Sequence, residues 1–476
     1  MNIKKILKNA VYLLMGNMGI RIITAVTIIL LARYSSPKEY GAFAIAIAVS
    51  TVAGYFSDAG ISNTFIREAV KKTANMEVLL GNYLVLRILF GIIASVITFV
   101  FVHSFYTNQH LIDIINWIVY PTIFGTTLTG VSTTFFQAKE KMGLSSLMIV
   151  IQGIAYSCAI GYGMLAKMSI LSISILYGIA FIITGVFSLV FVLFFSKIRR
   201  GWNSAILNQL LAFTVNGIII MTLPQLGPIL LSKVIPLSDV AYFSTAYKFP
   251  SVLYQIPGVV AVAFYPKLFK LGNNKELNNK HRSLSLVELK IMSFLGIAIS
   301  IPFIVSPNFW IISLLGQNYA SAGPALEILA YIVILQSISY PVADYITTKG
   351  EPYKRTLVLI ISFVIAICSY MLLGKEYGYM GGAIASIIVE LGLLVGYSIM
   401  MKRGLLFILN GIKFNVLSFL VTLVIAKFIP NFNSIIYMTI SVLCYMLFVL
   451  ILDRKMFIEI KTFVQEKFRS KGENHS

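Results

Sequence analysis

The chain has 476 residues, of which 58% are hydrophobic and 12% are charged, and its mean hydropathy is +0.87. Soluble domains carry about 25% charged residues, so this composition excludes a soluble globular protein and indicates an integral membrane protein. The net charge of +20 would suggest a nucleic-acid partner in a soluble protein. We expect no such partner here, because the basic residues are sorted between the loops on the two sides of a membrane.

Apolar segments of about 20 residues are long enough to cross a bilayer as helices. Fourteen such segments follow one another, so we predict an all-α polytopic membrane protein with about fourteen transmembrane helices. The first segment is too long for a cleavable signal peptide and lacks a small-residue cleavage site, so we expect it to remain as a helix. The expected spans are 10–33, 39–60, 79–102, 111–136, 144–166, 170–196, 206–233, 238–266, 286–313, 320–347, 355–374, 378–400, 410–428 and 434–452.

The distribution of Lys and Arg predicts the orientation of the chain. In this fourteen-helix arrangement, 29 of the 38 basic residues fall on the side of the N-terminus, the even-numbered loops and the C-terminal tail. Six fall near the opposite side and three lie within spans. Because cytoplasmic loops carry an excess of Lys and Arg, we expect both termini in the cytoplasm.

An internal repeat predicts how the spans are grouped. Residues 29–46 (ILLARYSSPKEYGAFAIA) resemble residues 229–246 (ILLSKVIPLSDVAYFSTA) at an offset of 200, and such repeats are common in transporters. We therefore expect two six-helix lobes of the same topology, followed by two further helices. In the tail, apolar and basic residues at helical spacing predict an amphipathic helix on the anionic inner leaflet, with a frayed, solvated tail as the alternative. The expected parts are 1–200, 201–403, 404–452 and 453–476.

Two basic residues lie in the middle of expected spans. Arg21 forms a polar stripe with Asn17 and Thr24 on the first span, and Lys248 lies on a similar stripe with Gln255 on the eighth. A charge at the centre of a spanning helix costs roughly 2.5–3.5 kcal/mol. We therefore predict that both stripes line a cavity between the lobes that binds an anion. The alternative for each is a bond to a carboxylate or carbonyl that only joins helices.

Further charged residues are candidates for substrate entry, coupling or gating. Arg87 lies about seven residues, or about 10 Å, from the cytoplasmic end of the third span, where it either contacts entering substrate or snorkels to the interface. Glu390, near the centre of the twelfth span, is either a proton carrier or a hydrogen-bonded structural acid. Asp344 is expected at the mouth of the cavity, and Asp58 is expected to pair with Arg67 near the cytoplasmic side.

Two acids mark the external starts of spans. Glu39 and Asp239 begin the second and eighth spans, where a negative charge complements the helix dipole. The alternative is an external gate in which they pair with Arg33 and Lys233. Six prolines between residues 224 and 266 predict kinks in the seventh and eighth spans, which we expect to bend during transport.

Motifs of catalysis and metal binding are missing from the sequence. The three cysteines lie singly within apolar segments, and the chain has no HExxH, GxSxG or phosphate-loop pattern. We therefore expect neither an enzyme nor a metal site, and no cofactor. Coupling to H⁺ or Na⁺ stays open.

Several short motifs resemble the polysaccharide biosynthesis flippase family, which includes the O-antigen and capsule repeat-unit flippases of the multidrug/oligosaccharidyl-lipid/polysaccharide exporter superfamily. The EYG-x-F and D-x-G-I-S…RE motifs are moderately specific, and length, helix number and repeat extend the resemblance more loosely over the chain. The matching residues are Asn9, Tyr12, 30–33 (LLAR), 36–43 (SPKEYGAF), 58–62 (DAGIS), Arg67 and Glu68.

This resemblance implies a V-shaped pair of helix bundles in the bacterial inner (plasma) membrane. It implies that an undecaprenyl-diphosphate-linked oligosaccharide is carried from the cytoplasmic to the periplasmic leaflet by alternating access, for O-antigen, lipopolysaccharide, capsule or exopolysaccharide synthesis. Polymerase and chain-length proteins of that pathway are the implied protein partners. Related flippases of lipid-linked peptidoglycan precursors place basic residues on helices one and eight, where this chain has Arg21 and Lys248; a lysine at the second position departs from the arginine of those relatives.

Two alternative functions are a multidrug exporter and a membrane glycosyltransferase. A cation-coupled multidrug exporter of the same superfamily commonly has an acid in its first helix, whereas this chain has Arg21 and no acid between Ala10 and Ala32. A membrane glycosyltransferase, such as a polymerase or ligase, usually needs a large external loop, and the external loops here are short. The flippase is therefore the preferred function.

Overall fold

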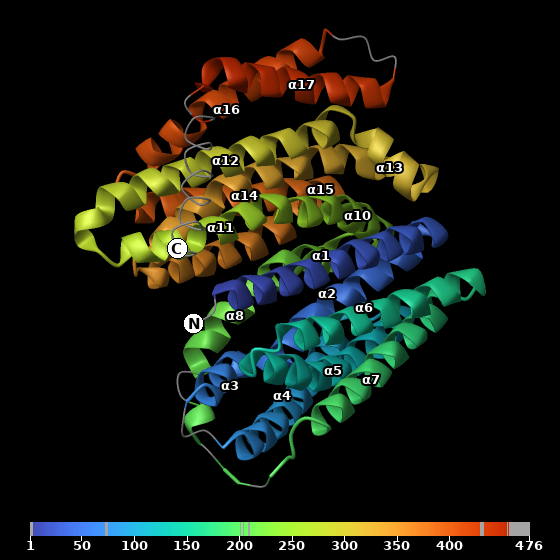
Figure 1. Cartoon of the computed structure of the whole chain (residues 1–476). Coiled ribbons are helices and arrows are strands. Elements are labelled where there is room, and N and C mark those ends of the chain that lie inside the picture. The colour runs from blue at the N-terminus through green and yellow to red at the C-terminus, as the bar shows by residue number, and fades with distance from the viewer. Residues whose placement is uncertain are drawn as a thin grey trace. The chain divides into compact units, whose positions relative to one another are not determined.

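The computed structural model describes residues 3–71, 75–199, 201–202, 204–207, 210–428, 433–454 and 456 (Figure 1). Their side chains are described from Gly19 onward, except at 205, 211–213, 215–216 and 275. The described residues form helices joined by short loops and contain no strand. The prediction of an all-α fold is therefore confirmed.

The chain divides into two compact units, Met1–Ser244 and Thr245–Ser476. The helices up to the boundary are α1 (Ile3–Tyr34), α2 (Pro37–Asp58), α3 (Ile61–Ala69), α4 (Met76–Phe105), α5 (Gln109–Ala138), α6 (Met142–Leu165), α7 (Ile170–Leu193), η1 (Ser204–Leu207), α8 (Leu210–Thr222), η2 (Leu223–Gln225), α9 (Leu226–Val234) and α10 (Leu237–Leu253), which crosses it. The later helices are α11 (Gln255–Gly272), η3 (Lys275–Leu277), α12 (Asn278–Val305), α13 (Pro307–Leu315), η4 (Gln317–Ala322), α14 (Gly323–Thr348), α15 (Pro352–Met400), α16 (Gly404–Ala426) and α17 (Ser434–Leu452). The expected division into lobes at residues 200 and 403 stays a prediction.

Twelve helical segments of the described residues are long and apolar enough to cross a membrane, so the protein is a multi-pass membrane protein. One of them, α15, covers two of the expected spans, because Gly378 (φ 60°) introduces a kink within it. α1 covers the first expected span and is not among the twelve. With α1 added and α15 counted twice, the segments correspond to the fourteen expected spans. The amphipathic tail expected at 453–476 lies almost entirely outside the described residues.

Local sequence signals explain where several helices begin. Ser36 accepts a hydrogen bond from the backbone N–H of Glu39 at the start of α2, and Pro37 occupies the first helical turn. Side-chain oxygens at helix N-termini satisfy backbone donors that have no partner within the helix. Asn75 and Asn108 cap α4 and α5 in the same way.

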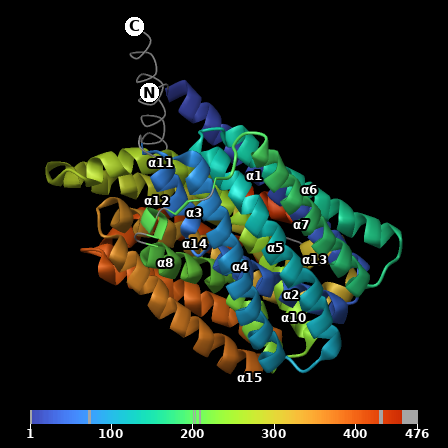
Figure 2. The same ribbon diagram turned by 90° about the horizontal axis from the view of Figure 1, so that it is seen from below.

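In the first unit, α5 lies at the centre and packs against α2, α4, α6 and α7 (Figure 2). Glycine allows the closest of these contacts: a Cβ atom at Gly125 would collide with the backbone carbonyl of Phe181 on α7. Small residues at helix interfaces let backbones approach closely in membrane proteins. The core of this unit therefore rests on tight packing around α5.

The second unit is built around α12 and α14, which pack against each other. α14 also contacts α11 and α15, and α12 also contacts α11, α16 and α17. Gly296 on α12 lies directly against Ser337 on α14, so a larger residue would separate the two helices.

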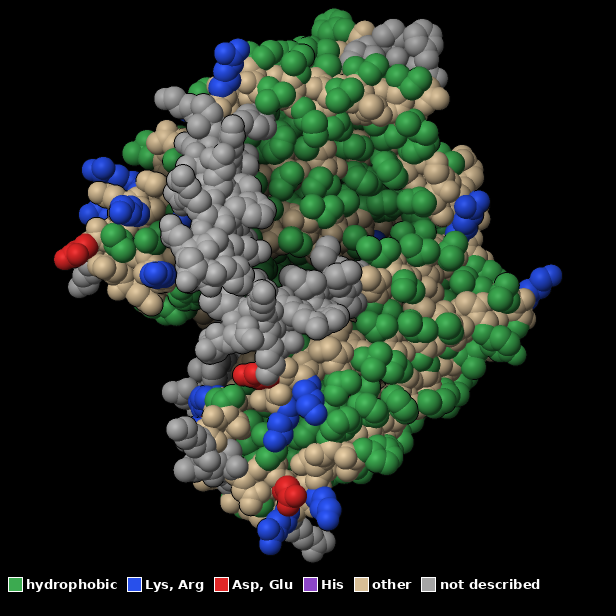
Figure 3. All heavy atoms as spheres, in the orientation of Figure 1, with side chains coloured by type: hydrophobic (Ala, Val, Ile, Leu, Met, Phe, Trp, Pro, Cys, Tyr) green, Lys and Arg blue, Asp and Glu red, His purple; other side chains and the backbone are tan. Residues whose placement is uncertain are grey.

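The surface agrees with a membrane location. On the face shown in Figure 3, hydrophobic side chains gather over the flanks of the helices, and Lys and Arg lie mainly at the helix ends. Many large apolar side chains on α4, α7, α15, α16 and α17 are exposed, as expected for helix faces that contact lipid.

The proline-rich region breaks its helices as predicted. Pro224 lies in η2, the short 3-10 segment between α8 and α9, and Pro257 lies in the first turn of α11. Pro250 and Pro266 lie inside α10 and α11. Whether these helices bend during transport stays a prediction.

Candidate functional site

A cavity of about 450 Å³ lies within the first unit, between α2, α4, α5 and α7. Most of its polar lining consists of hydroxyl groups, with one acid and one base among them. Three aromatic side chains complete the wall. The lining residues are Ser50, Thr51, Gly54, Tyr55, Asp58, Ser62, Arg87, Thr122, Thr126, Gly130, Thr133, Thr134, Tyr177, Phe181 and Met221.

The charged pair in this cavity joins α2 to α4. Arg87 Nη1 donates to Asp58 Oδ1 at 2.6 Å, and Nη2 donates to the backbone carbonyl of Thr126 on α5 at 3.0 Å. Arg87 is 4% exposed, so it does not snorkel to the interface. The guanidinium fits because residue 130 on α5 is glycine, where a Cβ would collide with Nη2.

The prediction that Asp58 pairs with Arg67 is wrong. Asp58 pairs with Arg87, and Arg67 Nε lies 3.1 Å from Glu68 Oε1. The physical reason is the turn after α2, where Ala59 and Gly60 adopt left-handed conformations (φ 44° and 76°) and start α3 in a new direction. Arg67 therefore lies on a separate short helix, whereas Asp58 ends α2 beside α4.

A chain of hydroxyl groups extends from the pair. Ser62 donates to Asp58, and its Oγ lies 2.7 Å from the hydroxyl of Tyr83. Tyr83 donates to Thr134 Oγ1 at 3.1 Å, and its ring stacks on Phe65 with centroids 4.5 Å apart. Since buried polar groups are costly without partners, this network fixes the position of Asp58 and Tyr83.

The aromatic wall connects the cavity to α1. Tyr177 and Phe181 line the cavity, and both rings pack against Tyr156 on α6, with centroid distances of 5.3 Å in each case. Tyr156 lies on α6, which packs against α1, and its hydroxyl group lies near Thr24. Thr24, one of the predicted site residues, is thus near an aromatic group that supports the cavity wall.

Arg21 lies on α1 close to Thr24, and its backbone carbonyl accepts a hydrogen bond from the Thr24 hydroxyl at 3.1 Å. The Arg21 side chain is exposed, so it is not sealed in a dry helix contact. The side chain of Asn17 lies outside the described residues. The role of this stripe in binding an anion stays a prediction.

Lys248 and Gln255 belong to the second unit. Lys248 is half-buried, and its backbone carbonyl accepts a hydrogen bond from Ser251 at 2.7 Å. Gln255 Nε2 donates to the carbonyl of Ser251 at 3.1 Å. A cavity shared by these residues and Arg21 stays a prediction.

The predicted acids of the second unit are both buried and have partners. Gln336 Nε2 donates to Glu390 Oε1 at 2.6 Å between α14 and α15. Arg355 Nη1 lies 3.5 Å from Asp344 Oδ1 and 3.4 Å from Thr347 Oγ1. Glu390 is thus a hydrogen-bonded acid, and its role as a proton carrier stays a prediction.

Sequence reasoning missed a third acid, Glu288 on α12. Glu288, Ser285 and His281 share one face of the helix at positions i, i−3 and i−7, and all three are fully buried. His281 Nε2 lies 2.9 Å from Thr348 Oγ1, but neither carboxylate oxygen of Glu288 has a hydrogen-bond partner among the described residues. The helical spacing of these three residues is a usable signal in the sequence. It was missed because the ninth expected span begins at residue 286, so only Glu288 lies inside it.

The contact made by Glu39 differs from the expected external gate. Glu39 Oε2 lies 3.3 Å from His110 Nε2 and not beside Arg33. His110 is in the first turn of α5 and Glu39 in the first turn of α2, and these two helices pack against each other.

The second expected gate pair, Asp239 with Lys233, is also absent from the described contacts. Lys233 Nζ donates to the backbone carbonyl of Phe105 at 2.8 Å and lies over the ring of that residue. Asp239 accepts a hydrogen bond from Ser238. Lys233 therefore attaches the end of α9 to α4 and leaves no gate pair.

The family of the chain follows from comparison with known proteins. Residues 6–271 match the family model described as polysaccharide biosynthesis protein. The chain belongs to this family. The resemblance seen in the sequence motifs is therefore confirmed, and no curated protein sequence matches the chain significantly.

Solved structures show that the fold is shared with membrane transporters. A lipid II flippase MurJ in an inward closed conformation aligns with a TM-score of 0.72 and 18% identity, over 94% of this chain and 100% of that protein. An inward-facing multidrug resistance MATE transporter aligns with a TM-score of 0.65 and 13% identity, over 82% and 95%. The MATE multidrug transporter DinF-BH aligns with a TM-score of 0.59 and 13% identity, over 82% and 94%. At these identities the likeness shows the fold and not the substrate.

Proposed function

We propose that the protein is a flippase for an undecaprenyl-diphosphate-linked oligosaccharide repeat unit. It moves this lipid from the cytoplasmic to the periplasmic leaflet by alternating access, for O-antigen, capsule or exopolysaccharide synthesis. The observation that carries the proposal is the family match over residues 6–271, which includes the whole cavity of the first unit. The fold shared with a lipid II flippase supports it.

The charge of the cargo fits a basic site. A lipid diphosphate must cross about 30 Å of hydrocarbon, and a guanidinium can bind its oxygens through two parallel hydrogen bonds. Arg21 on α1 and Lys248 on α10 are the basic side chains that we propose receive the diphosphate. Arg87 has one buried nitrogen, Nε, without a hydrogen-bond partner among the described residues, so the guanidinium has one unused donor.

Asp58 has a defined part in this proposal. A buried guanidinium without a counter-ion is strongly unfavourable, so Asp58 neutralises Arg87 when no substrate is present. The phosphate oxygens then compete with Asp58 for Nη1. Ser62, which donates to Asp58, holds the displaced carboxylate in place.

The remaining lining suits a sugar. Sugar hydroxyl groups need hydrogen-bond partners and flat apolar faces, and the cavity offers Ser and Thr hydroxyl groups beside Tyr55, Tyr177 and Phe181. Its volume of about 450 Å³ lies within the usual range of small-ligand pockets. It accommodates part of a repeat unit in the state described.

The proposal also includes the membrane, the orientation of the chain and its partner proteins. The protein lies in the bacterial inner membrane with both termini in the cytoplasm, as the bias of Lys and Arg indicates. Its two six-helix lobes alternate access, and polymerase and chain-length proteins of the pathway receive the product. The proposed role is transport without catalysis.

A cation-coupled multidrug exporter is the second candidate. The MATE-like fold is compatible with it, and buried acids within membrane helices, such as Glu288 and Glu390 here, often mark ion pathways. In the cavity of the first unit, however, the acid Asp58 is already paired with Arg87. This arrangement favours an anionic cargo.

Restoration of surface polysaccharide in a flippase-deficient strain tests the proposal. Arg21→Ala is expected to abolish the polymer while the protein remains in the membrane, because it removes an exposed guanidinium proposed to bind the diphosphate. Arg33→Ala, in the last turn of the same helix, is the matched control and is expected to restore the polymer. Normal polymer with Arg21→Ala would overturn the role of Arg21 in binding the anion.

A further inference from the structure

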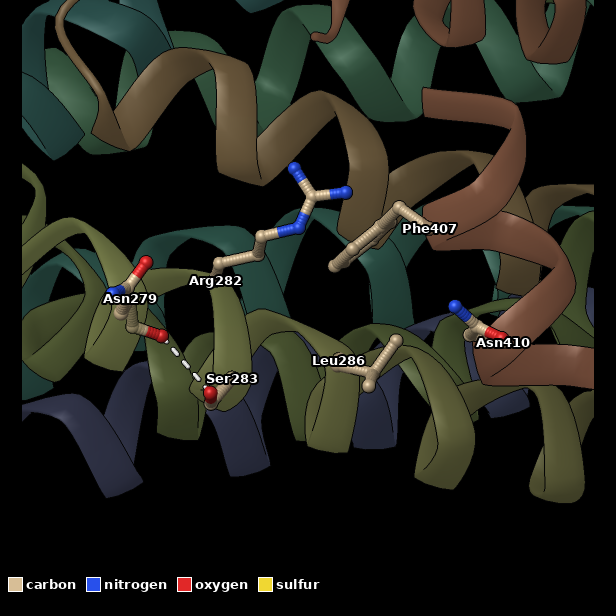
Figure 4. A pocket seen from close by; sticks show the side chains of 6 residues that line it. All are labelled: Asn279, Arg282, Ser283, Leu286, Phe407 and Asn410. Atoms are coloured by element: carbon tan, nitrogen blue, oxygen red, sulfur yellow. Dashed lines mark hydrogen bonds between the residues drawn. The ribbon is translucent and has the colours of Figure 1, made fainter. Parts of the chain in front are cut away.

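A groove on the second unit lies between the first turns of α12 and α16 (Figure 4). Its volume is about 270 Å³. Arg282 extends from α12 toward the ring of Phe407 on α16, and Asn410 approaches from the other side. The lining residues are Asn279, Arg282, Ser283, Leu286, Phe407 and Asn410.

Backbone carbonyls hold the guanidinium of Arg282. Nη1 donates to the carbonyl of Lys402 at 3.0 Å, and Nη2 donates to the carbonyl of Arg403 at 3.2 Å. The guanidinium carbon lies 5.4 Å from the centroid of the Phe407 ring. These partners fix the side chain but leave its positive charge uncompensated, and a guanidinium has five N–H donors.

Basic side chains outnumber acidic ones around the groove; the nearest acids in the sequence are Glu276, before α12, and Glu288, which is fully buried on the His281 face of that helix. Residues 277–287 and 401–426, which form both walls, contain no Asp or Glu. They contain five basic residues, and those on the rim are exposed. A ligand of complementary charge is therefore an anion. The basic residues are Lys280, Arg282, Lys402, Arg403 and Lys413.

The spans expected from the sequence place the groove at the depth of the lipid headgroups. Arg282 precedes the expected span 286–313 by four residues, or about 6 Å along a helix, and Asn410 is the first residue of the expected span 410–428. On α16, Leu405, Leu406 and Leu409 are exposed next to the groove. A polar, basic pocket is thus continuous with an apolar surface that faces the acyl chains.

We propose that this groove binds the phosphate headgroup of an anionic phospholipid from the surrounding leaflet. Arg282 and the amides of Asn279 and Asn410 donate hydrogen bonds to the phosphate oxygens, while Leu286 and Phe407 contact the apolar start of the lipid. Basic pockets between membrane helices on the cytoplasmic side bind such headgroups. The proposal rests on the membrane location of α12 and α16 and is independent of the transported cargo.

Native mass spectrometry of the full-length protein, titrated with phosphatidylglycerol or phosphatidylcholine, tests the proposal. We expect a phosphatidylglycerol adduct that Arg282→Gln weakens about tenfold, which corresponds to about 1.4 kcal/mol. Because Arg282 also supports the turn at Lys402, a second variant, Asn410→Leu, removes one donor and leaves that support intact. It is expected to weaken the adduct severalfold.

Lys427→Gln is the matched control, because it removes one exposed positive charge from the opposite end of α16. We expect it to retain the adduct. Equal binding of phosphatidylglycerol and phosphatidylcholine, or equal affinity in wild type and Asn410→Leu, would overturn the proposal. Displacement of the adduct by millimolar inorganic phosphate would also overturn it, since the site would then bind a soluble anion.

Discussion

Arg87 in α4 and Glu288 in α12 are buried charged residues that each lie about three turns from the start of their helix. Arg87 donates to Asp58 and to the carbonyl of Thr126, whereas neither carboxylate oxygen of Glu288 has a partner among the described residues. A guanidinium cannot lose its charge in a protein, but a carboxyl group can take up a proton. The first unit therefore contains a permanently charged group, Arg87, that needs a counter-ion. The second contains an acid, Glu288, that can become neutral by taking up a proton.

Removal of the Arg87 charge is expected to lower thermal stability more than any other substitution considered. Arg87→Ala leaves Asp58 without its partner, and removing one member of a buried pair costs about 3–5 kcal/mol. We expect a marked fall in thermal stability of the purified protein, measured by unfolding in detergent. The double variant Arg87→Met with Asp58→Leu is expected to recover most of that stability. A single variant as stable as wild type would show that the pair does not hold α2 and α4 together.

Gly130→Ala tests the same pair through its packing. The added Cβ collides with the Arg87 guanidinium, and overpacking of a tight site typically costs about 1–3 kcal/mol. We expect an intermediate loss of thermal stability. Gly143→Ala is the control, because no atom lies within 4 Å of the added Cβ there. If both variants lost the same stability, steric contact with Arg87 would not be the cause.

Tyr83→Phe is expected to have a smaller effect. It removes the hydroxyl group that links Ser62 to Thr134 and keeps the ring that stacks on Phe65. The loss of such hydrogen bonds costs about 0.5–1.5 kcal/mol each. Thermal unfolding of the variant, compared with Tyr162→Phe at an exposed position, measures it. Equal thermal stability of the two variants would show that the hydrogen bonds of Tyr83 do not stabilise the protein.

Glu288→Gln is expected to change thermal stability least. It therefore gives the clearest contrast between the paired charge of the first unit and the acid of the second. No ion pair of the described residues is broken, so we expect a change below about 1 kcal/mol in the unfolding measurement. A loss of stability comparable to that of Arg87→Ala would mean that Glu288 is a paired charge like Arg87, and the contrast would be lost.

The spans could be predicted from the sequence because the signal is local. About 20 consecutive apolar residues suffice to recognise each helix, and even the two halves of α15 were expected separately. Arg87 stood out for the same reason, as a single charge in an apolar segment. Its partner could not be predicted, because the contact with Asp58 depends on how α2 packs against α4.

Residues at expected boundaries were the hardest to interpret. His281, Ser285 and Glu288 straddle the start of the ninth expected span, so no single segment displayed them as a stripe. The pair of Glu39 with His110 joins two helices whose starts lie far apart in the sequence, and only tertiary structure brings them together. The anion-binding roles of Arg21 and Lys248 stay predictions.

The most direct test of the proposed flippase is transport by the purified protein in liposomes. An undecaprenyl-diphosphate oligosaccharide and a cationic rhodamine dye are offered to wild-type protein and to Arg21→Ala. The account predicts that the wild-type protein moves the lipid between leaflets, does not export the dye, and loses lipid transport in the variant. Dye export without lipid movement would contradict an anionic lipid as the cargo.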